Sequence, residues 1–170
     1  YLHYNSGLHI SDNGKLLASH LNRLAGLSQH ETLALHIVAH SMGGLVVRSA
    51  CHYAASDPDQ FDDNGWLDKL QKVVFLGSPH HGALLERGGK WIDYLLAMHP
   101  YSEPFSWLGK IRSKGVNDLG YGNVREEDWY ESHQSEAQQD RRVPTPLPND
   151  VHCYAIAAVT SHQSNYVRDS

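Results

Sequence analysis

The residues Ala39-His40-Ser41-Met42-Gly43-Gly44 carry the most informative pattern in this chain. A short apolar, partly β-branched run precedes them at 35–38, and a segment with helical periodicity follows at 45–53. A serine flanked by small residues at a strand-to-helix turn is a nucleophile elbow, written G-x-S-x-G. The turn is tight, so the positions two before and two after the serine, here Ala39 and Gly43, have little room for side chains. The pattern therefore predicts a strand, a sharp turn and a helix.

Two residues of this pattern have a predicted chemical role. The Ser41 hydroxyl would stand exposed above the sheet as a nucleophile, and the N–H of Met42 would point to where an oxyanion forms. The alternative is a glycine-rich turn that holds a serine by chance, since alanine replaces the first glycine of the pattern. The flanking strand and helix favour the catalytic interpretation.

Size and charge limit the classes of protein to consider. The chain has 170 residues, of which 41% are hydrophobic and 19% charged, as in an ordinary globular domain. The net charge is −5 and no basic block occurs, so nucleic acid is not an expected partner. No apolar run approaches the roughly 20 residues of a transmembrane helix. The sequence does not specify an oligomeric state.

Cysteine and histidine usage predicts neither a disulfide framework nor a metal site. Cys51 and Cys153 are expected to be reduced core residues, which favours a reducing compartment such as the cytoplasm. The 13 histidines include the pairs His36/His40 and His80/His81, but neither pair has the HExxH context or a Cys-x-x-Cys partner. We therefore expect no metal and no cofactor.

Strands alternate with helices along the chain. Leu17, Leu21 and Leu24 have helical spacing, with Ser11 or Asp12 as the expected N-cap. The other predicted elements are a strand at 34–39, a helix to about 56, and strands at 72–77 and 151–159. The run at 72–77 is continuously apolar, which is typical of a strand buried on both faces of a parallel sheet. The fold class is α/β, with helices on both faces of a parallel sheet.

The segment 82–148 is too long for a connecting loop and is expected to be an inserted cap. The chain then divides into a core at 1–81, a cap or lid at 82–148, and a core strand with a truncated C-terminal part at 149–170. His80 and His81 lie directly before the cap. They either line the substrate site, to which we assign them, or only pack the turn, which is the more common role of such histidines. Its apolar residues either pack on the sheet or, as we favour, offer a surface to an acyl chain. Those assigned to substrate binding are Trp91, Leu95, Phe105 and Trp107.

Three segments together resemble the α/β-hydrolase superfamily. They are the stretch 39–44, the strand 73–77 running into Ser78-Pro79-His80-His81-Gly82, and the opening Tyr4-Asn5-Ser6-Gly7. Within the superfamily the chain is similar to lipase-like serine esterases, including the group that resembles the GPI inositol-deacylases. The resemblance runs from the start of the chain to about residue 160. It implies an α/β-hydrolase-like sheet with an inserted cap.

The resemblance also implies a mechanism. Ser41 would attack a carboxylic ester, of a lipid-like substrate, and water would hydrolyse the acyl-enzyme. In this fold the acid and then the histidine follow the serine along the chain. Asp169 is the one carboxylate after the last predicted strand, and no histidine follows it. We therefore expect the chain to be part of a longer domain, without a complete triad and without the second oxyanion donor.

Two other functions stay open at this point. An acyltransferase or a peptidase would use the same serine, because the turn fixes the nucleophile and not the acceptor. A non-catalytic binding module would keep the fold without the triad.

Overall fold

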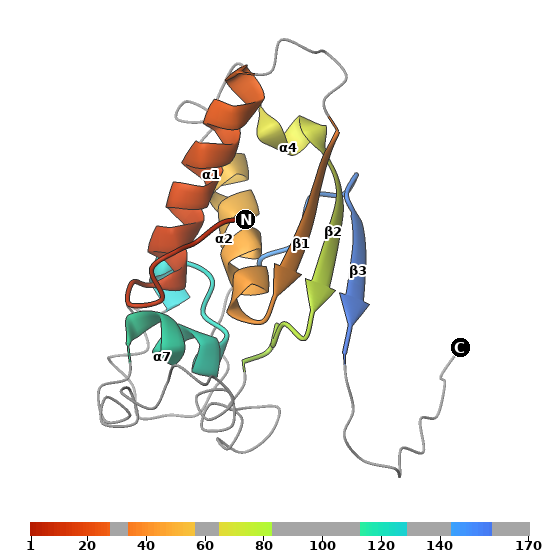
Figure 1. The fold of residues 1–170 in the computed structure, drawn as a ribbon. Helices are drawn as coiled ribbons and strands as arrows, with labels where there is room; N and C mark the ends of the chain where they lie inside the picture. Colours follow the sequence, from red (N-terminus) through yellow and green to blue (C-terminus); the bar gives the residue numbers. More distant parts are fainter. Residues whose placement is uncertain (28–33, 57–64, 83–112, 129–143, 158–170) are drawn as a thin grey trace, which may run out of the picture.

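The computed structural model describes residues 1–27, 34–56, 65–82, 113–128 and 144–157. Strands and helices alternate in these segments (Figure 1). In chain order the elements are α1 (Ile10–Leu27), β1 (Leu35–His40), α2 (Met42–Ser56), α4 (Trp66–Lys69), β2 (Leu70–Leu76), α7 (Lys114–Tyr121) and β3 (His152–Ile156). None of the described helices is long and apolar enough to cross a membrane.

The three strands form one parallel sheet in the order β1-β2-β3. Val38 pairs with Val74, and Val74 pairs with Tyr154, so the three residues form one row across the sheet. All three strands end at the same edge, where the chain continues into the Ser41 turn and the loop after β2 (Figure 1). The predicted α/β class with a parallel sheet is confirmed.

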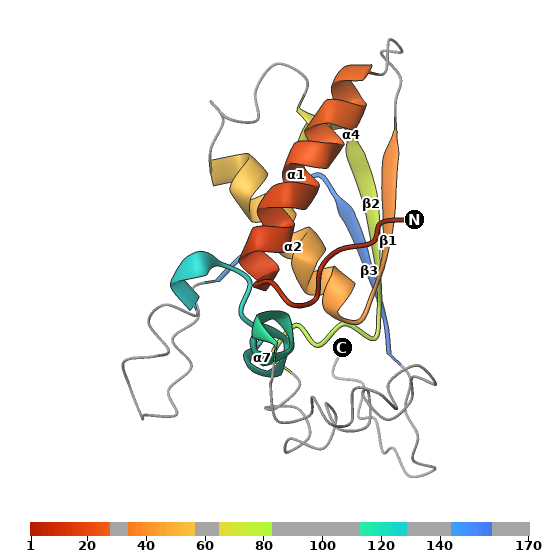
Figure 2. The same cartoon turned by 60° about the vertical axis from the view of Figure 1, so that its left-hand side comes forward.

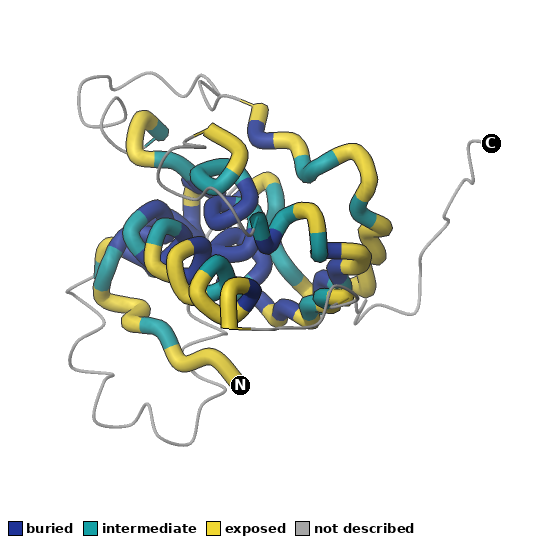
Figure 3. The backbone as a smooth tube through the Cα atoms, turned by 90° about the horizontal axis from the view of Figure 1, so that it is seen from above, coloured by how far each residue is buried: buried dark blue, intermediate teal, exposed yellow. Residues whose placement is uncertain are grey.

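Helices α1 and α2 cover one face of this sheet, as Figures 1 and 2 both show. Buried residues gather at the centre of the molecule, and exposed residues surround them (Figure 3). The core is apolar and includes Ile10, Leu17, Leu45, Val46, Ala50, Trp66, Val73 and Phe75. This burial supplies the main favourable free energy that holds the helices on the sheet.

The other face of the sheet is open in the described part of the chain. Val38 on this face is 68% exposed and Tyr154 is 52% exposed. The prediction of helices on both faces is therefore confirmed for the face under α1 and α2, and stays a prediction for the other. The prediction that Cys153 is a core residue is wrong, because β3 lies at the edge of the described sheet and all its residues are exposed. Cys51 is buried, as expected.

Helices α1 and α2 approach each other closely at Gly14. A Cβ atom at this position would overlap the Ser49 side chain and lie 3.0 Å from the Ser49 carbonyl carbon. A glycine in the interior of a helix costs about 1 kcal/mol relative to alanine, so its presence here indicates a packing requirement. The contact fixes how α2, which begins next to Ser41, lies against α1.

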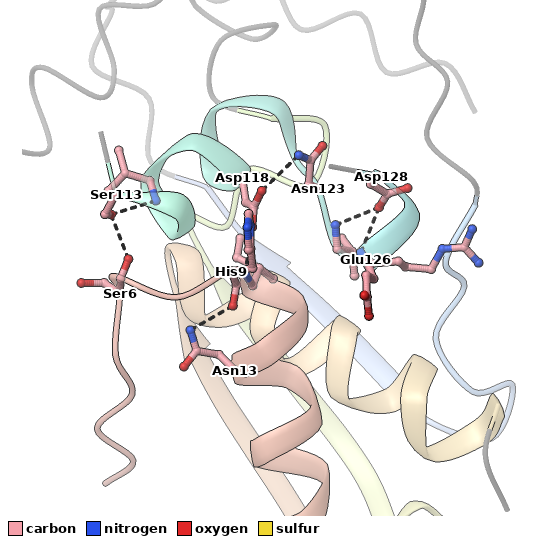
Figure 4. A network of polar contacts seen from close by, with 12 residues as sticks. Ser6, His9, Asn13, Ser113, Asp118, Asn123, Glu126 and Asp128 are labelled. Carbon is pink, nitrogen blue, oxygen red and sulfur yellow. Dashed lines mark hydrogen bonds and ion pairs between the residues drawn. The ribbon is translucent and has the colours of Figure 1, made fainter. Parts of the chain in front are cut away.

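A buried carboxylate joins α7 to the start of α1 (Figure 4). Asp118 is 0% exposed, and its Oδ2 accepts a hydrogen bond from the backbone N–H of Ile10 at 2.9 Å. The same oxygen lies 2.9 Å from His9 Nδ1, and Oδ1 accepts from Asn123 Nδ2 at 3.1 Å. Burial raises the pKa of the Asp118 carboxyl, and these hydrogen bonds oppose the shift. Asp118 thus caps a helix that begins 108 residues earlier in the chain.

Exposed contacts on either side of Asp118 hold the same region in place (Figure 4). Ser113 donates a hydrogen bond to the carbonyl of Ser6 at 2.9 Å and accepts one from the N–H of Val116. Lys15 and Glu126 form an ion pair at 2.6 Å. Helix α7 lies inside the predicted cap at 82–148, but 83–112 and 129–143 lie outside the described residues. The domain boundaries therefore stay a prediction.

Asp118→Ala should lower the free energy of unfolding by about 3–5 kcal/mol, because it leaves buried donors without an acceptor. Glu126→Ala is the matched control, since it removes the exposed partner of an ion pair and should cost less than about 1 kcal/mol. Urea denaturation followed by circular dichroism measures both values. Equal losses in the two variants would contradict the role of Asp118 as the buried anchor of α7.

Candidate active site

Ser41 lies in the turn between β1 and α2 with a left-handed backbone conformation. The residue is buried, with 8% of its surface exposed, which differs from the prediction that its hydroxyl stands exposed above the sheet. The φ of Ser41 is 51°, and Ser41 is the one non-glycine residue with positive φ in the described segments. Such a conformation costs an L-residue roughly 1–3 kcal/mol, so the surrounding structure must hold it. The Ser41 N–H donates to the carbonyl of Leu76 at 2.9 Å, and the Ser41 carbonyl accepts from the N–H of Gly44 at 3.1 Å. These hydrogen bonds tie the turn to β2 and to the first turn of α2.

Small residues next to Ser41 allow the start of α2 to pack closely against β2 and the loop after it. The tightest of these positions is Gly44. A Cβ atom on Gly44 would lie 2.6 Å from Ser78 Cβ and 3.0 Å from the Phe75 ring. A Cβ atom on Gly43 would meet only the Tyr4 hydroxyl, at an ordinary contact distance of 3.7 Å. The sequence pattern singled out Gly43, whereas the structure places the stronger steric requirement at Gly44.

Met42 is the first residue of α2, directly after Ser41. The first N–H groups of a helix have no acceptor within the helix, and the positive end of the helix dipole lies there. A negative oxygen formed next to Ser41 would meet this end of α2. Met42 is therefore in the place that its predicted role requires, and the role itself stays a prediction.

His80 and His81 lie in the loop after β2 and line a cavity of about 630 Å³. Arg48 of α2 lines the same cavity and donates to the carbonyl of Thr145 at 3.0 Å and to that of His80 at 3.4 Å. Arg48 also lies 3.4 Å from His80 Nδ1. Burial, followed by the positive charge of Arg48 and then His81, lowers the pKa of His80 to about 4. The described residues that line the cavity do not include Ser41.

The structure brings together only part of the predicted site. Among the described residues no hydrogen bond joins the Ser41 hydroxyl to a histidine. The candidate acid Asp169 lies outside the described residues, as do the predicted acyl-site residues Trp91, Leu95, Phe105 and Trp107. In the described segments no three histidine, cysteine or acidic residues form a group that could hold a metal ion.

Sequence reasoning missed Arg48 and the His9–Asp118 pair. Arg48 lies one helical turn after Gly44 on α2. Its helical spacing from Gly44 is the sequence signal that would have placed it near the Ser41 turn. Nothing in the sequence joins His9 to Asp118, because 109 residues separate them.

Three comparisons place the chain among known proteins. A family profile described as "Domain of unknown function (DUF7379)" matches residues 1–119. Protein SERAC1 of Danio rerio is 37% identical over 59 residues, which cover 35% of this chain and 8% of that protein. The crystal structure of Bacillus licheniformis lipase BlEst2 in its mature form is similar with a TM-score of 0.43 and 22% sequence identity. That match covers 78% of this chain and 44% of the lipase chain.

The chain thus spans a small part of the zebrafish protein and less than half of the lipase. The family profile, in contrast, covers more than half of the chain and includes β1, the Ser41 turn, α2 and β2. The chain therefore belongs to the family described as the domain of unknown function DUF7379.

Proposed function

We propose that this domain is a serine hydrolase that cleaves carboxylic esters, with Ser41 as the nucleophile. The observation that carries the proposal is the left-handed backbone of Ser41 between a parallel strand and a helix. A non-glycine residue keeps such a conformation where the structure around it enforces it, and functional sites are where this strain gathers. In a nucleophile elbow this conformation directs the serine hydroxyl toward a bound substrate, which here would have to reach the buried Ser41.

In the proposed reaction Ser41 Oγ attacks the ester carbonyl while its proton passes to a base. The carbonyl oxygen becomes an oxyanion, which the Met42 N–H stabilises at the N-terminus of α2. The tetrahedral intermediate collapses, the alcohol leaves with a proton, and Ser41 stays acylated. Water then attacks the acyl-enzyme, which releases the carboxylic acid and returns the proton to Ser41. Asp169 is the candidate acid that orients the base, and no described histidine is assigned as that base.

We further propose that the ester is lipid-like. The support is compositional, because Trp91, Leu95, Phe105 and Trp107 give the predicted cap an apolar surface. Such a surface would contact the distal part of a long acyl chain and leave a short one untouched.

In the full-length protein Ser41 should react covalently with a fluorophosphonate probe, and Ser41→Ala should abolish the labelling. The reason is that only an activated serine attacks such phosphorus electrophiles rapidly. Ser56→Ala is the matched control, because Ser56 Oγ lies 3.5 Å from His52 Nδ1 but belongs to ordinary helical backbone. Gel fluorescence measures the labelling, and circular dichroism checks the fold. Labelling that persists in Ser41→Ala would refute the assignment.

Leu95→Ser should lower kcat/KM for an octanoyl ester at least about fivefold and leave that for an acetyl ester unchanged. A fivefold loss corresponds to about 1 kcal/mol of lost apolar contact with the longer chain. Nitrophenyl esters of the two acids provide the measurement in the full-length protein. Equal losses on both esters would overturn the lipid-like part of the proposal and leave the role of Ser41 standing.

A further inference from the structure

The ring of His80 is held by contacts with Phe75 of β2 and Arg48 of α2. It packs edge-on against Phe75, with ring centroids 4.7 Å apart and planes at 88°. Arg48 approaches from α2 and lies 3.4 Å from both Nδ1 and the carbonyl oxygen of His80. A ring held by an aromatic neighbour and a guanidinium has little freedom to turn.

The contact with Arg48 determines which ring nitrogen carries the proton. A guanidinium has only donors, so His80 Nδ1 must be the acceptor. A neutral imidazole that accepts at Nδ1 carries its hydrogen on Nε2. Because burial and the charges of Arg48 and His81 lower the pKa of His80 to about 4, the ring is neutral at pH 7. His80 thus offers one N–H donor of fixed direction and no free acceptor.

No hydrogen bond among the described residues uses His80 Nε2. His80 also lines the cavity of about 630 Å³, within the size range of pockets that hold small organic ligands. Much of the cavity wall is apolar and includes Phe75, Val124, Pro146 and Leu147. Arg48, His81 and Asp128 also line the cavity, so the His80 donor is one of a few polar groups in a mainly apolar wall. A few polar groups in such a wall can orient a mainly hydrocarbon ligand.

The cavity is connected to the Ser41 turn through the loop after β2 and through α2, although neither Ser41 nor Gly44 lines it. Ser78, two positions before His80, packs directly against Gly44, the residue that hydrogen-bonds the Ser41 carbonyl. Arg48 lies one helical turn farther along α2. A molecule in this cavity would therefore contact Arg48 of α2 and His80 of the loop, two segments that also adjoin the Ser41 turn.

We propose that His80 is a substrate-binding residue, whose Nε2–H donates a hydrogen bond to an ester oxygen while the hydrocarbon part lies in the adjoining cavity. The proposal rests on the assignment of Ser41 as nucleophile and adds how the ester is held. In this proposal His80 is not the catalytic base, because its Nδ1 accepts a hydrogen bond from Arg48 and the ring binds a proton weakly. Arg48 polarises the ring from behind, which makes Nε2–H a stronger donor to an oxygen acceptor.

Binding of two unreactive probes tests the proposal in a Ser41→Ala background. The probe 2-octanone carries a carbonyl acceptor, and 1-chloroheptane is a matched hydrocarbon without a strong one. His80→Phe keeps an aromatic ring but removes the donor, and should weaken 2-octanone binding about fivefold to tenfold while leaving 1-chloroheptane unchanged. His80→Gln restores a donor and should recover part of the loss. His20→Phe, at an exposed position of α1, is the control and should change neither value.

Titrations followed by ¹H–¹⁵N NMR give the dissociation constants. In the protein with native His80, the ring ¹⁵N shifts at pH 6 should identify the neutral Nε2–H form, with protonation only near pH 4. This second readout does not depend on how the variants fold. Any of three results would overturn the proposal. The first is a His80 ring with its hydrogen on Nδ1, and the second is an equal loss of affinity for both probes in His80→Phe. The third is no binding of 2-octanone to the protein with native His80. The probes are unreactive and alanine replaces Ser41 in these variants, so none of these results depends on whether Ser41 is a nucleophile.

Discussion

The left-handed backbone of Ser41 is the constraint on which the described structure depends. Strand β1 and helix α2 would have to move apart if this residue relaxed to an ordinary conformation. The hydrogen bond to Leu76 joins the turn to β2, and the close fit of Gly44 against Ser78 joins α2 to the loop after β2. The sheet edge, the helix N-terminus and the next loop are thus held around one serine.

Polar contacts between segments that are distant in sequence stabilise the region around the sheet edge at which Ser41 lies. Asp118 closes the N-terminus of α1 and holds α7 beside it, and Arg48 links α2 to the loop after β2 and to Thr145. Buried or half-buried charges of this kind are costly unless each one is fully hydrogen-bonded, so they specify one arrangement of the segments. The apolar core holds the layers together, and these contacts decide how the edge near Ser41 is shaped.

The sequence was sufficient for the local elements and insufficient for contacts between them. Hydrophobic spacing and the serine pattern predicted α1, β1, α2 and β2 to within a few residues, because these depend on neighbouring positions. The expected caps of α1, Ser11 or Asp12, were wrong, since Asp118 caps the helix from another element. Cys153 was wrong because hydropathy does not show that β3 lies at the edge of the described sheet. The requirement for Gly44 and the contacts of His80 likewise arise only in the folded structure.

The most direct measurement is a crystal structure of the full-length protein after reaction with an alkyl phosphonate. The account predicts a phosphorus–oxygen bond to Ser41, with φ of Ser41 still positive, and a phosphonyl oxygen within hydrogen-bonding distance of the Met42 N–H. The adduct mimics the tetrahedral intermediate, so it tests the nucleophile and the oxyanion donor together. An adduct on a different residue, or a phosphonyl oxygen directed away from the N-terminus of α2, would contradict the account.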